Sequence, residues 1–265
     1  MTAAFDIPAY LARIGLAEQP APDLAGLIAI QRAHRLAIPF ENLDIRLGRG
    51  IDLDPDHVFD KLVLRRRGGY CFEQNGLFLS ALLAMGFAAR PLLARVWLFA
   101  ADTPPKTHML VLVTLNGEEW IADAGFGGSY TPPMPLAEQE MQSPDGTRHR
   151  LIRDGEFGWM LERQAGEGEW SGQYSFSTAR VWPSDIALAN HFTATASGSR
   201  FVENAVASVV LPTGFASLFN RSYSRTSAKG EEAAEITSAK MLQLRLSLVF
   251  GIDLSNEEVA RLGLF

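Results

Sequence analysis

The sequence predicts an α+β fold, because its hydrophobic periodicity changes along the chain. Residues 1–88 carry the spacing of helices, residues 89–190 carry mostly short strand-like runs, and residues 191–265 mix the two. The middle part is expected to form a compact antiparallel sheet or barrel. No repeat, low-complexity tract or long linker separates these parts, so we expect them to pack closely against one another.

The helices expected in the first part have signals at their ends. Pro22 and Asp23 suit a first helical turn, and Asp54 before Pro55 is typical of an N-cap followed by proline at the first helical position. Pro39 breaks the helical pattern, so the stretch IPFENLD is expected to be a loop folded back into the core. The expected helices cover 7–14, 21–36, 55–64 and 72–85, and the loop covers 38–44.

Tight-turn dipeptides separate the strand-like runs. Asn116-Gly117 is a strong signal of a two-residue hairpin turn, so the runs on either side of it should pair as antiparallel strands. Ser255 and Glu258 form the pattern of a capping box at the start of a last helix. Strands are expected at 91–100, 108–116, 119–122, 148–154, 158–163, 173–177, 205–211, 215–223 and 233–237, and further helices at 183–192, 239–250 and 255–261.

Composition restricts the classes of function. The chain has 265 residues, 47% of them hydrophobic, and a formal net charge of −6, which argues against nucleic-acid binding and a polybasic membrane contact. The single cysteine excludes an intrachain disulfide and a zinc site built on several thiolates, and we expect no metal. It fits a reducing compartment, so the cytoplasm is the expected location. Neither a secretory signal nor a membrane-spanning helix is expected.

The chemistry is expected at RGGYCFEQN, residues 67–75, which contains the single cysteine. The glycines at 68–69 can adopt backbone conformations closed to other residues, and the apolar helix expected after them would hold Cys71 in its first turn. Unpaired N–H groups and the helix dipole favour a thiolate there, and the arginines at 65–67 add positive charge. A lone cysteine is more often a small buried hydrophobe, but packing alone would not need the polar residues at 73–75.

A thiolate nucleophile usually needs a base, and the base needs a group that orients it. His108 is the best candidate base, because it is followed by a wholly apolar strand, MLVLV. Asp123 follows the partner strand of the expected hairpin, so its carboxylate should reach the imidazole and fix its tautomer. Singly, a strand-end histidine is more often a satisfied structural residue, and an aspartate before Ala-Gly is more often part of a turn. Their joint placement favours a relay of Cys71, His108 and Asp123.

A glycine-rich stretch follows Asp123. Its backbone N–H groups could bind an anion, as glycine-rich loops bind phosphates, although hairpin ends often contain such glycines without any ligand. Beside a catalytic thiol, the loop suggests a substrate that carries a phosphate or an oxyanion. The residues are Gly125, Phe126, Gly127, Gly128 and Ser129.

Taken together, these motifs resemble those of the bacterial arylamine N-acetyltransferases. The combination of Arg-Gly-Gly-x-Cys-x-Glu with a downstream histidine and Asp-x-Gly-Phe-Gly is specific to that pattern. The motifs occur in the family's order and span most of the chain. They are IPFENLD at 38–44, RGGYCFEQN at 67–75, THMLVLV at 107–113, WIADAGFGGS at 120–129 and PSDIALANHFTATASGSRF at 183–201.

The resemblance implies three domains in a cysteine-protease-like triad arrangement. They are a helical bundle with the nucleophile at 1–88, a β-barrel with the histidine and aspartate at 89–190, and a small α/β lid at 191–265. It also implies acetyl-CoA as co-substrate in a ping-pong reaction. In that reaction Cys71 takes the acetyl group and passes it to an arylamine, an arylhydrazine or an arylhydroxylamine.

By the same resemblance, two sets of residues would contact substrates. The apolar acceptor pocket would be lined by Phe40, Val96, Phe126 and Phe201, and coenzyme A would contact Gly125, Gly127, Gly128 and Ser129. Ala124 stands where the family often has valine, and Met109 where it often has arginine. These departures affect the expected acceptor preference rather than the activity, since neither residue is a member of the triad.

Two alternatives stay open at the level of sequence. A cysteine hydrolase or a transglutaminase-like acyl transferase uses the same triad. A binding module in which Cys71 merely packs needs no triad at all. The physiological acceptor, the preferred acyl-CoA, the oligomeric state and the groups that contact the 3′-phosphate of coenzyme A do not follow from the sequence.

Overall fold

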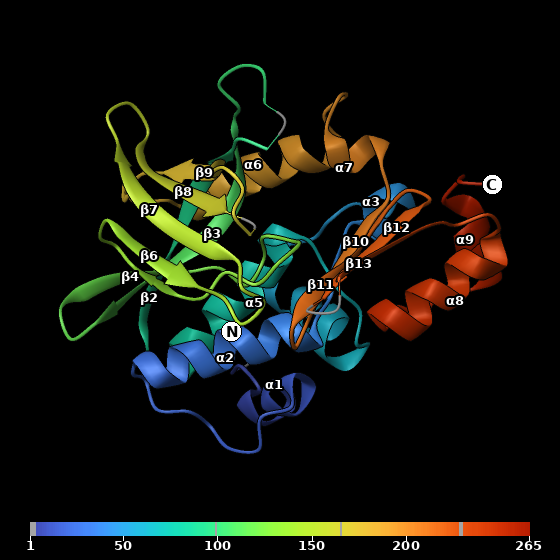
Figure 1. Ribbon diagram of the computed structural model, residues 1–265. Coiled ribbons are helices and arrows are strands. Elements are labelled where there is room, and N and C mark those ends of the chain that lie inside the picture. Colours follow the sequence, from blue (N-terminus) through green and yellow to red (C-terminus); the bar gives the residue numbers. More distant parts are fainter. Residues whose placement is uncertain (1–3, 99, 165, 228–229) are drawn as a thin grey trace.

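The computed structural model describes residues 4–98, 100–164, 166–227 and 230–265, and it confirms the predicted α+β fold. In Figure 1 the barrel strands, coloured green to yellow, lie above α2, and the second sheet, coloured orange, lies between the helical part and the C-terminal helices. The division of the chain into domains at 1–88, 89–190 and 191–265 stays a prediction.

The helices of the first part begin where side chains cap them. Asp6, Asp23 and Asp54 each accept a hydrogen bond from a backbone N–H of the first turn. The helix predicted at 21–36 begins only at Leu24, because Asp23 occupies the cap position. These helices are α1 (Ile7–Ile14), α2 (Leu24–Ala37), α4 (Pro55–Phe59), which continues as a π-helical segment (Asp60–Leu64), and α5 (Cys71–Ala84).

The loop predicted at 38–44 does fold back into the core, since all of its residues are buried, but the prediction that it lacks regular structure was wrong. It contains a short strand, β1 (Phe40–Glu41), and a helical turn, α3 (Leu43–Arg46). β1 pairs antiparallel with a strand of the C-terminal part, Phe40 opposite Ser208. Its strand conformation therefore depends on a partner far along the chain, which no local pattern reveals.

The barrel is an eight-stranded antiparallel sheet in the order β5-β4-β3-β2-β9-β8-β7-β6. Its edge strands β5 and β6 lie next to each other, so the sheet nearly closes on itself. The sequence missed these two strands, because such short runs show no clear alternation. The strands are β2 (Ala88–Val96), β3 (Lys106–Leu115), β4 (Glu118–Ala122), β5 (Met134–Pro135), β6 (Gln139–Gln142), β7 (Arg148–Asp154), β8 (Gly158–Gln164) and β9 (Ser171–Phe176).

The predicted hairpin of β3 and β4 is confirmed. Leu115 pairs with Glu118, and the turn between them is Asn116 at φ 51° and Gly117 at φ 85°. Two consecutive left-handed residues match the twist of a two-residue hairpin. The strand predicted at 91–100 begins earlier, at Ala88, and ends earlier, at Val96, and residue 99 lies outside the described residues.

The second sheet has the order β1-β10-β11-β12-β13. The single strand predicted at 215–223 was wrong, because Asn220 at φ 53° turns the chain and splits it into two strands. The predicted capping box of Ser255 and Glu258 is confirmed. The elements of this part are α6 (Pro183–Thr195), α7 (Arg200–Glu203), β10 (Val206–Leu211), β11 (Gly214–Phe219), β12 (Ser222–Ser227), β13 (Gly230–Glu235), α8 (Ala239–Phe250) and α9 (Asn256–Arg261).

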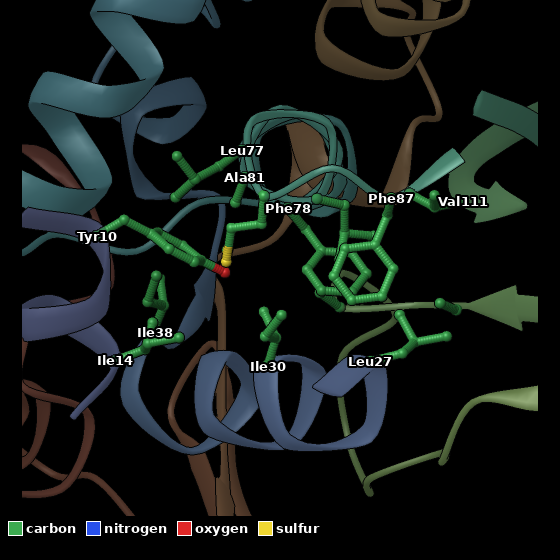
Figure 2. Packing of buried hydrophobic residues seen from close by; sticks show 14 of the residues in the cluster. Tyr10, Ile14, Leu27, Ile30, Ile38, Leu77, Phe78, Ala81, Phe87 and Val111 are labelled. Atoms are coloured by element: carbon green, nitrogen blue, oxygen red, sulfur yellow. The ribbon is translucent and has the colours of Figure 1, made fainter. Parts of the chain in front are cut away.

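A hydrophobic core between α1, α2 and α5 fixes the helix that carries the cysteine (Figure 2). Tyr10, Ile30 and Phe78 are fully buried there, and Phe87 and Val111 extend the cluster to the barrel strands. Packing on several sides therefore fixes α5, and with it the position of its first residue.

Among the described residues, the structure contains no helix with the length and apolarity needed to cross a membrane.

Candidate active site

Cys71 is the first residue of α5, and it is buried at 3% exposure. Its Sγ lies 3.7 Å from the carbonyl oxygen of Thr107, the residue before His108. The helix start is fixed by Glu73, whose Oε2 accepts the backbone N–H of Tyr70 at 3.1 Å. The sulfur is thus held at the positive end of a buried helix, where a thiolate is favoured.

The two glycines before Cys71 serve close packing. We expected them to supply unusual backbone angles, but neither has a positive φ, and the left-handed residue of this stretch is Arg66 at φ 55°. A Cβ on Gly68 would lie 2.3 Å from the carbonyl oxygen of Pro39, and a Cβ on Gly69 would lie 2.8 Å from a carboxylate oxygen of α5. The glycines therefore let the chain pass between β1 and α5.

His108 and Asp123 meet across the hairpin as the register predicts. Nε2 of His108 lies 2.7 Å from Oδ2 of Asp123, and both residues are buried. The other carboxylate oxygen, Oδ1, accepts hydrogen bonds from Asn75 Nδ2 and from the backbone N–H of Gly125, each at 2.9 Å. The carboxylate is therefore fixed in orientation, and it fixes the ring in turn.

The electrostatics of this pair favour an imidazolium. Burial acts to lower the pKa of His108, but the charge of Asp123 and its hydrogen bond outweigh burial and raise that pKa from 6.5 to about 10. Burial acts to raise the pKa of Asp123, but His108 and the hydrogen-bond donors hold it below its usual value. Since Nε2 is bonded to Asp123, Nδ1 is the nitrogen that can face Cys71, whose hydrogen bond and charge also raise the pKa of His108.

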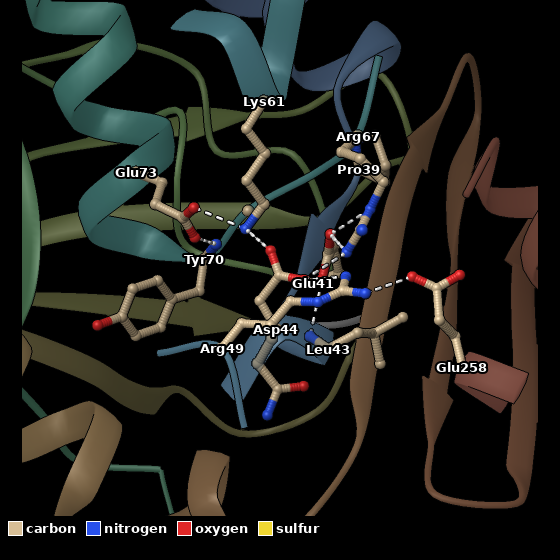
Figure 3. A network of polar contacts seen from close by, with 12 residues as sticks. Pro39, Glu41, Leu43, Asp44, Arg49, Lys61, Arg67, Tyr70, Glu73 and Glu258 are labelled. Atoms are coloured by element: carbon tan, nitrogen blue, oxygen red, sulfur yellow. Dashed lines mark hydrogen bonds and ion pairs between the residues drawn. The ribbon is translucent and has the colours of Figure 1, made fainter. Parts of the chain in front are cut away.

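A buried network of ion pairs lies behind the start of α5 (Figure 3). Lys61 Nζ bridges Glu73 at 2.7 Å and Asp44 at 2.8 Å, and Arg67 binds Glu41 at 2.7 Å and Asp44 at 3.3 Å. We expected arginines 65–67 to add positive charge near the thiol. That expectation is corrected in part, because the charge of Arg67 is balanced by these carboxylates.

Replacing Lys61 with methionine is expected to destabilise the fold by about 3–5 kcal/mol, because it leaves Glu73 buried without its partner. Burial already raises the pKa of Glu73 to about 7 against the opposing effect of Lys61. Urea denaturation measures the free energy of unfolding. The matched control is Arg65→Met, which removes an exposed pair with Asp60 and should cost less than about 1 kcal/mol. Equal costs for the two variants would contradict this role of Lys61.

Asn75 is a positioning residue that the sequence did not assign. It lies one turn after Cys71 on α5, and besides Asp123 its side chain binds the carbonyl oxygen of Met109 at 2.5 Å and the N–H of Ala124 at 2.9 Å. Gln31 on α2 accepts the backbone N–H of Asp123 at 3.1 Å. A polar residue four positions after the cysteine in an apolar helix is the signal that could have identified Asn75.

Replacing Asn75 with alanine is expected to lower the rate of the acetyl transfer predicted at Cys71 by roughly 10- to 100-fold, the effect of losing a hydrogen bond to a charged group. Alkylation of Cys71 should continue, since the nucleophile itself is untouched. Steady-state kinetics of the variant measure the loss. The exposed Asn256→Ala is the control, and a variant N75A with the activity of that control would show that Asn75 does not position Asp123.

One cavity of about 730 Å³ has His108 and the thiol of Cys71 in its walls. The ring of Phe126 packs 5.0 Å from that of His108, and the rings of Phe40 and Phe201 lie 5.9 Å apart. The structure thus brings together at one cavity every residue that the sequence predicted for the site, except Asp123, which lies behind His108. They are Cys71, His108, Phe40, Val96, Phe126, Phe201, Gly125, Gly127, Gly128 and Ser129.

The glycine loop after Asp123 is shaped by its neighbours. A Cβ on Gly125 would lie 2.9 Å from Cα of Cys71, so a larger residue would push the loop away from α5. The N–H of Gly125 binds Asp123, and that of Gly128 binds Ser208 Oγ at 3.1 Å. These two donors are therefore engaged within the protein, and contact of the loop with coenzyme A stays a prediction.

No group of three or more metal-binding side chains occurs among the residues that the structure describes.

The chain matches the family model described as N-acetyltransferase over residues 23–259. The arylamine N-acetyltransferase / N-hydroxyarylamine O-acetyltransferase of Salmonella typhimurium is 42% identical over 78% of this chain and 73% of that protein. The arylamine N-acetyltransferase of Mycolicibacterium smegmatis is 37% identical over 96% and 94%. The chain belongs to the arylamine N-acetyltransferase family.

Solved structures of this family share the fold. The Salmonella typhimurium arylamine N-acetyltransferase superposes with a TM-score of 0.91 at 34% identity, covering 98% of both chains. The Mycobacterium marinum arylamine N-acetyltransferase, solved in complex with CoA, gives a TM-score of 0.90 at 33% identity, over 97% of this chain and 98% of that one. The protein is therefore an enzyme of the acyltransferase class, and the predicted family is confirmed.

Proposed function

We propose that the protein transfers the acetyl group of acetyl-CoA to the nitrogen of an arylamine, an arylhydrazine or an arylhydroxylamine, through a thioester on Cys71. The buried pair of His108 and Asp123 beside the thiol carries this proposal. The names of the relatives support the acceptor class, and the relative solved with CoA supports the donor. Cytoplasmic location is part of the proposal, and the single cysteine supports it.

The first half of the reaction is a thioester exchange. The Cys71 thiolate attacks the carbonyl carbon of acetyl-CoA, a new C–S bond forms, and the bond to the coenzyme sulfur breaks. The imidazolium of His108 supplies the proton to the departing thiolate. One thioester replaces another, so the step costs little free energy, and the acetyl group stays on the enzyme after the coenzyme leaves.

The second half uses the acceptor's lone pair. An aromatic amine is uncharged at neutral pH, so its nitrogen can attack the thioester carbonyl directly. His108, neutral after the first half, takes the amine proton while the C–S bond to Cys71 breaks. The rings of Phe40, Phe126 and Phe201 offer apolar and stacking surface for the acceptor.

Isolated acetyl-enzyme tests this sequence of steps. Protein treated with acetyl-CoA and then freed of coenzyme is expected to acetylate one equivalent of arylamine and to regain a reactive thiol. Chromatography of the product and the intact mass of the protein measure both events. Discharge that requires added coenzyme A would show that donor and acceptor must be bound together, which contradicts a ping-pong reaction. Cleavage of peptides by the same protein would instead favour a cysteine hydrolase.

A further inference from the structure

A polar pair lies inside the barrel, away from the triad. His149 on β7 pairs in register with Arg163 on β8, and the next pair on the same face of these strands is Leu151 with Leu161. Both leucines are buried inside the barrel. Residues two apart on a strand face the same side, so His149 and Arg163 also point inward. Both line the cavity that contains Cys71.

Neither side chain is satisfied by the protein. His149 is 1% exposed, and neither of its ring nitrogens makes a hydrogen bond of ordinary geometry with the described residues. Nε of Arg163 is also buried without a partner, and no ion pair joins its guanidinium to a carboxylate within the described part of the chain. Buried polar groups are nearly always hydrogen-bonded, because an unmade bond costs free energy. Unpaired donors in a cavity wall point to a ligand.

The charges around the pair define which ligand fits. Burial lowers the pKa of His149 to about 4, and Arg163 acts in the same direction. Asp145 and a long hydrogen-bond contact with the Tyr130 backbone oppose this change. The imidazole is therefore neutral at pH 7 and offers one N–H donor, while the guanidinium of Arg163 stays charged. Asp145 is the charged neighbour of both, and its Oδ1 accepts the N–H of Thr147. Hydroxyl and amide side chains complete this part of the wall, namely Ser129, Thr131, Ser171 and Gln173.

We propose that His149 and Arg163 form a subsite for an anionic substituent, a carboxylate or a sulfonate, on the aromatic ring of the acceptor. This inference rests on the proposed function and specifies its substrate class. A guanidinium binds such a group through charge-assisted hydrogen bonds, and the imidazole N–H adds a neutral donor. The phenylalanines of the same cavity would hold the ring, with its amine toward Cys71.

The acyl donor is the other possible source of an anion. Its phosphates carry several negative charges, whereas the subsite has one cation and a buried neutral imidazole beside the carboxylate of Asp145. A group with a single charge matches this balance better. The acceptor is therefore assigned to the subsite, and the experiment below separates it from the donor.

The test compares 4-aminobenzoate with its neutral analogue 4-aminobenzamide in the wild type and in Arg163→Met and His149→Phe. For R163M, kcat/KM for 4-aminobenzoate is expected to fall about 10- to 100-fold, while that for 4-aminobenzamide changes less than about threefold. For H149F, kcat/KM for 4-aminobenzoate should also fall more than kcat/KM for 4-aminobenzamide, but by a smaller factor than for R163M. The KM for acetyl-CoA should not change. The exposed Arg225→Met is the control, and thermal melting confirms that each variant is folded.

The possible outcomes are distinct. Three results would overturn the proposal: equal losses for both acceptors, no loss for either acceptor, or a raised KM for acetyl-CoA measured with the neutral acceptor. The third result would show that the subsite binds a phosphate of the donor. Calorimetric binding of 4-aminobenzoate to wild type and R163M gives a second readout that needs no turnover. A wild type that forms no acetyl-enzyme would refute the proposed function, while the calorimetric difference would still decide whether the subsite binds anions.

Discussion

Replacing Cys71 with alanine is expected to abolish acetyl transfer, with a loss of at least about 10,000-fold, because no other thiol exists in the chain to carry the acetyl group. Incubation with acetyl-CoA should add the mass of one acetyl group to the wild type and none to the variant. Intact-mass spectrometry measures this difference directly.

The Cys71→Ala variant should remain folded. The side chain is small, so its removal takes away only the contact of 3.7 Å to the carbonyl oxygen of Thr107, the hydrogen bond with His108 and a little packing. A melting temperature near that of the wild type is the control for the lost activity. Acetylation of the C71A variant at another residue, at the wild-type rate, would contradict the assignment of Cys71 as nucleophile.

Replacing Asp123 with asparagine is expected to lower activity by about 10,000-fold through the tautomer of His108. The Oδ1 of the new amide would keep the hydrogen bonds from Asn75 and Gly125, so its NH₂ group would face Nε2 of His108. Nε2 would then have to accept, and the neutral ring would carry its proton on Nδ1, the nitrogen that faces Cys71. Such a ring cannot take a proton from the thiol.

Steady-state kinetics and intact-mass analysis of the Asp123→Asn variant check this loss. The control is Asp102→Asn, the same chemical change at an exposed position, which should leave activity unchanged. Some destabilisation of the D123N variant is also expected, because a buried charge-assisted bond becomes a neutral one. A folded D123N variant with acetyl transfer near the wild-type rate would show that the carboxylate does not orient the imidazole.

The contact of His108 with Asp123 and the place of Cys71 at a helix start could be predicted from sequence, because each depends on local signals. The Asn116-Gly117 turn fixes the register of its hairpin, and the register brings His108 to Asp123. The cysteine at a helix start follows from the apolar run after it. The two glycines before Cys71 were misread, because glycine can serve either a positive φ or close packing, and sequence alone does not separate the two. In the structure they permit close packing.

Other features depend on contacts between distant segments. β1 exists because Phe40 pairs with Ser208, and Asn75 matters because α5 packs beside the loop after β4. The unsatisfied state of His149 is visible only once the barrel places it opposite Arg163. The wrong strand at 215–223 has a local cause, since Asn220 in a run of strand-forming residues gave too weak a turn signal.

The central claim is that the His108 imidazolium, held by Asp123, lies beside Cys71 and makes its sulfur a nucleophile at neutral pH. Since Asp123 raises the pKa of His108 to about 10, the ring stays charged well above pH 7. The rate of iodoacetamide alkylation of Cys71, measured against pH, tests this directly. The predicted wild-type rate is nearly constant from about pH 6 to pH 8, because the imidazolium keeps its charge across this range, and the rate of D123N rises with pH. A wild-type rate that increases about tenfold per pH unit across this range would contradict the account.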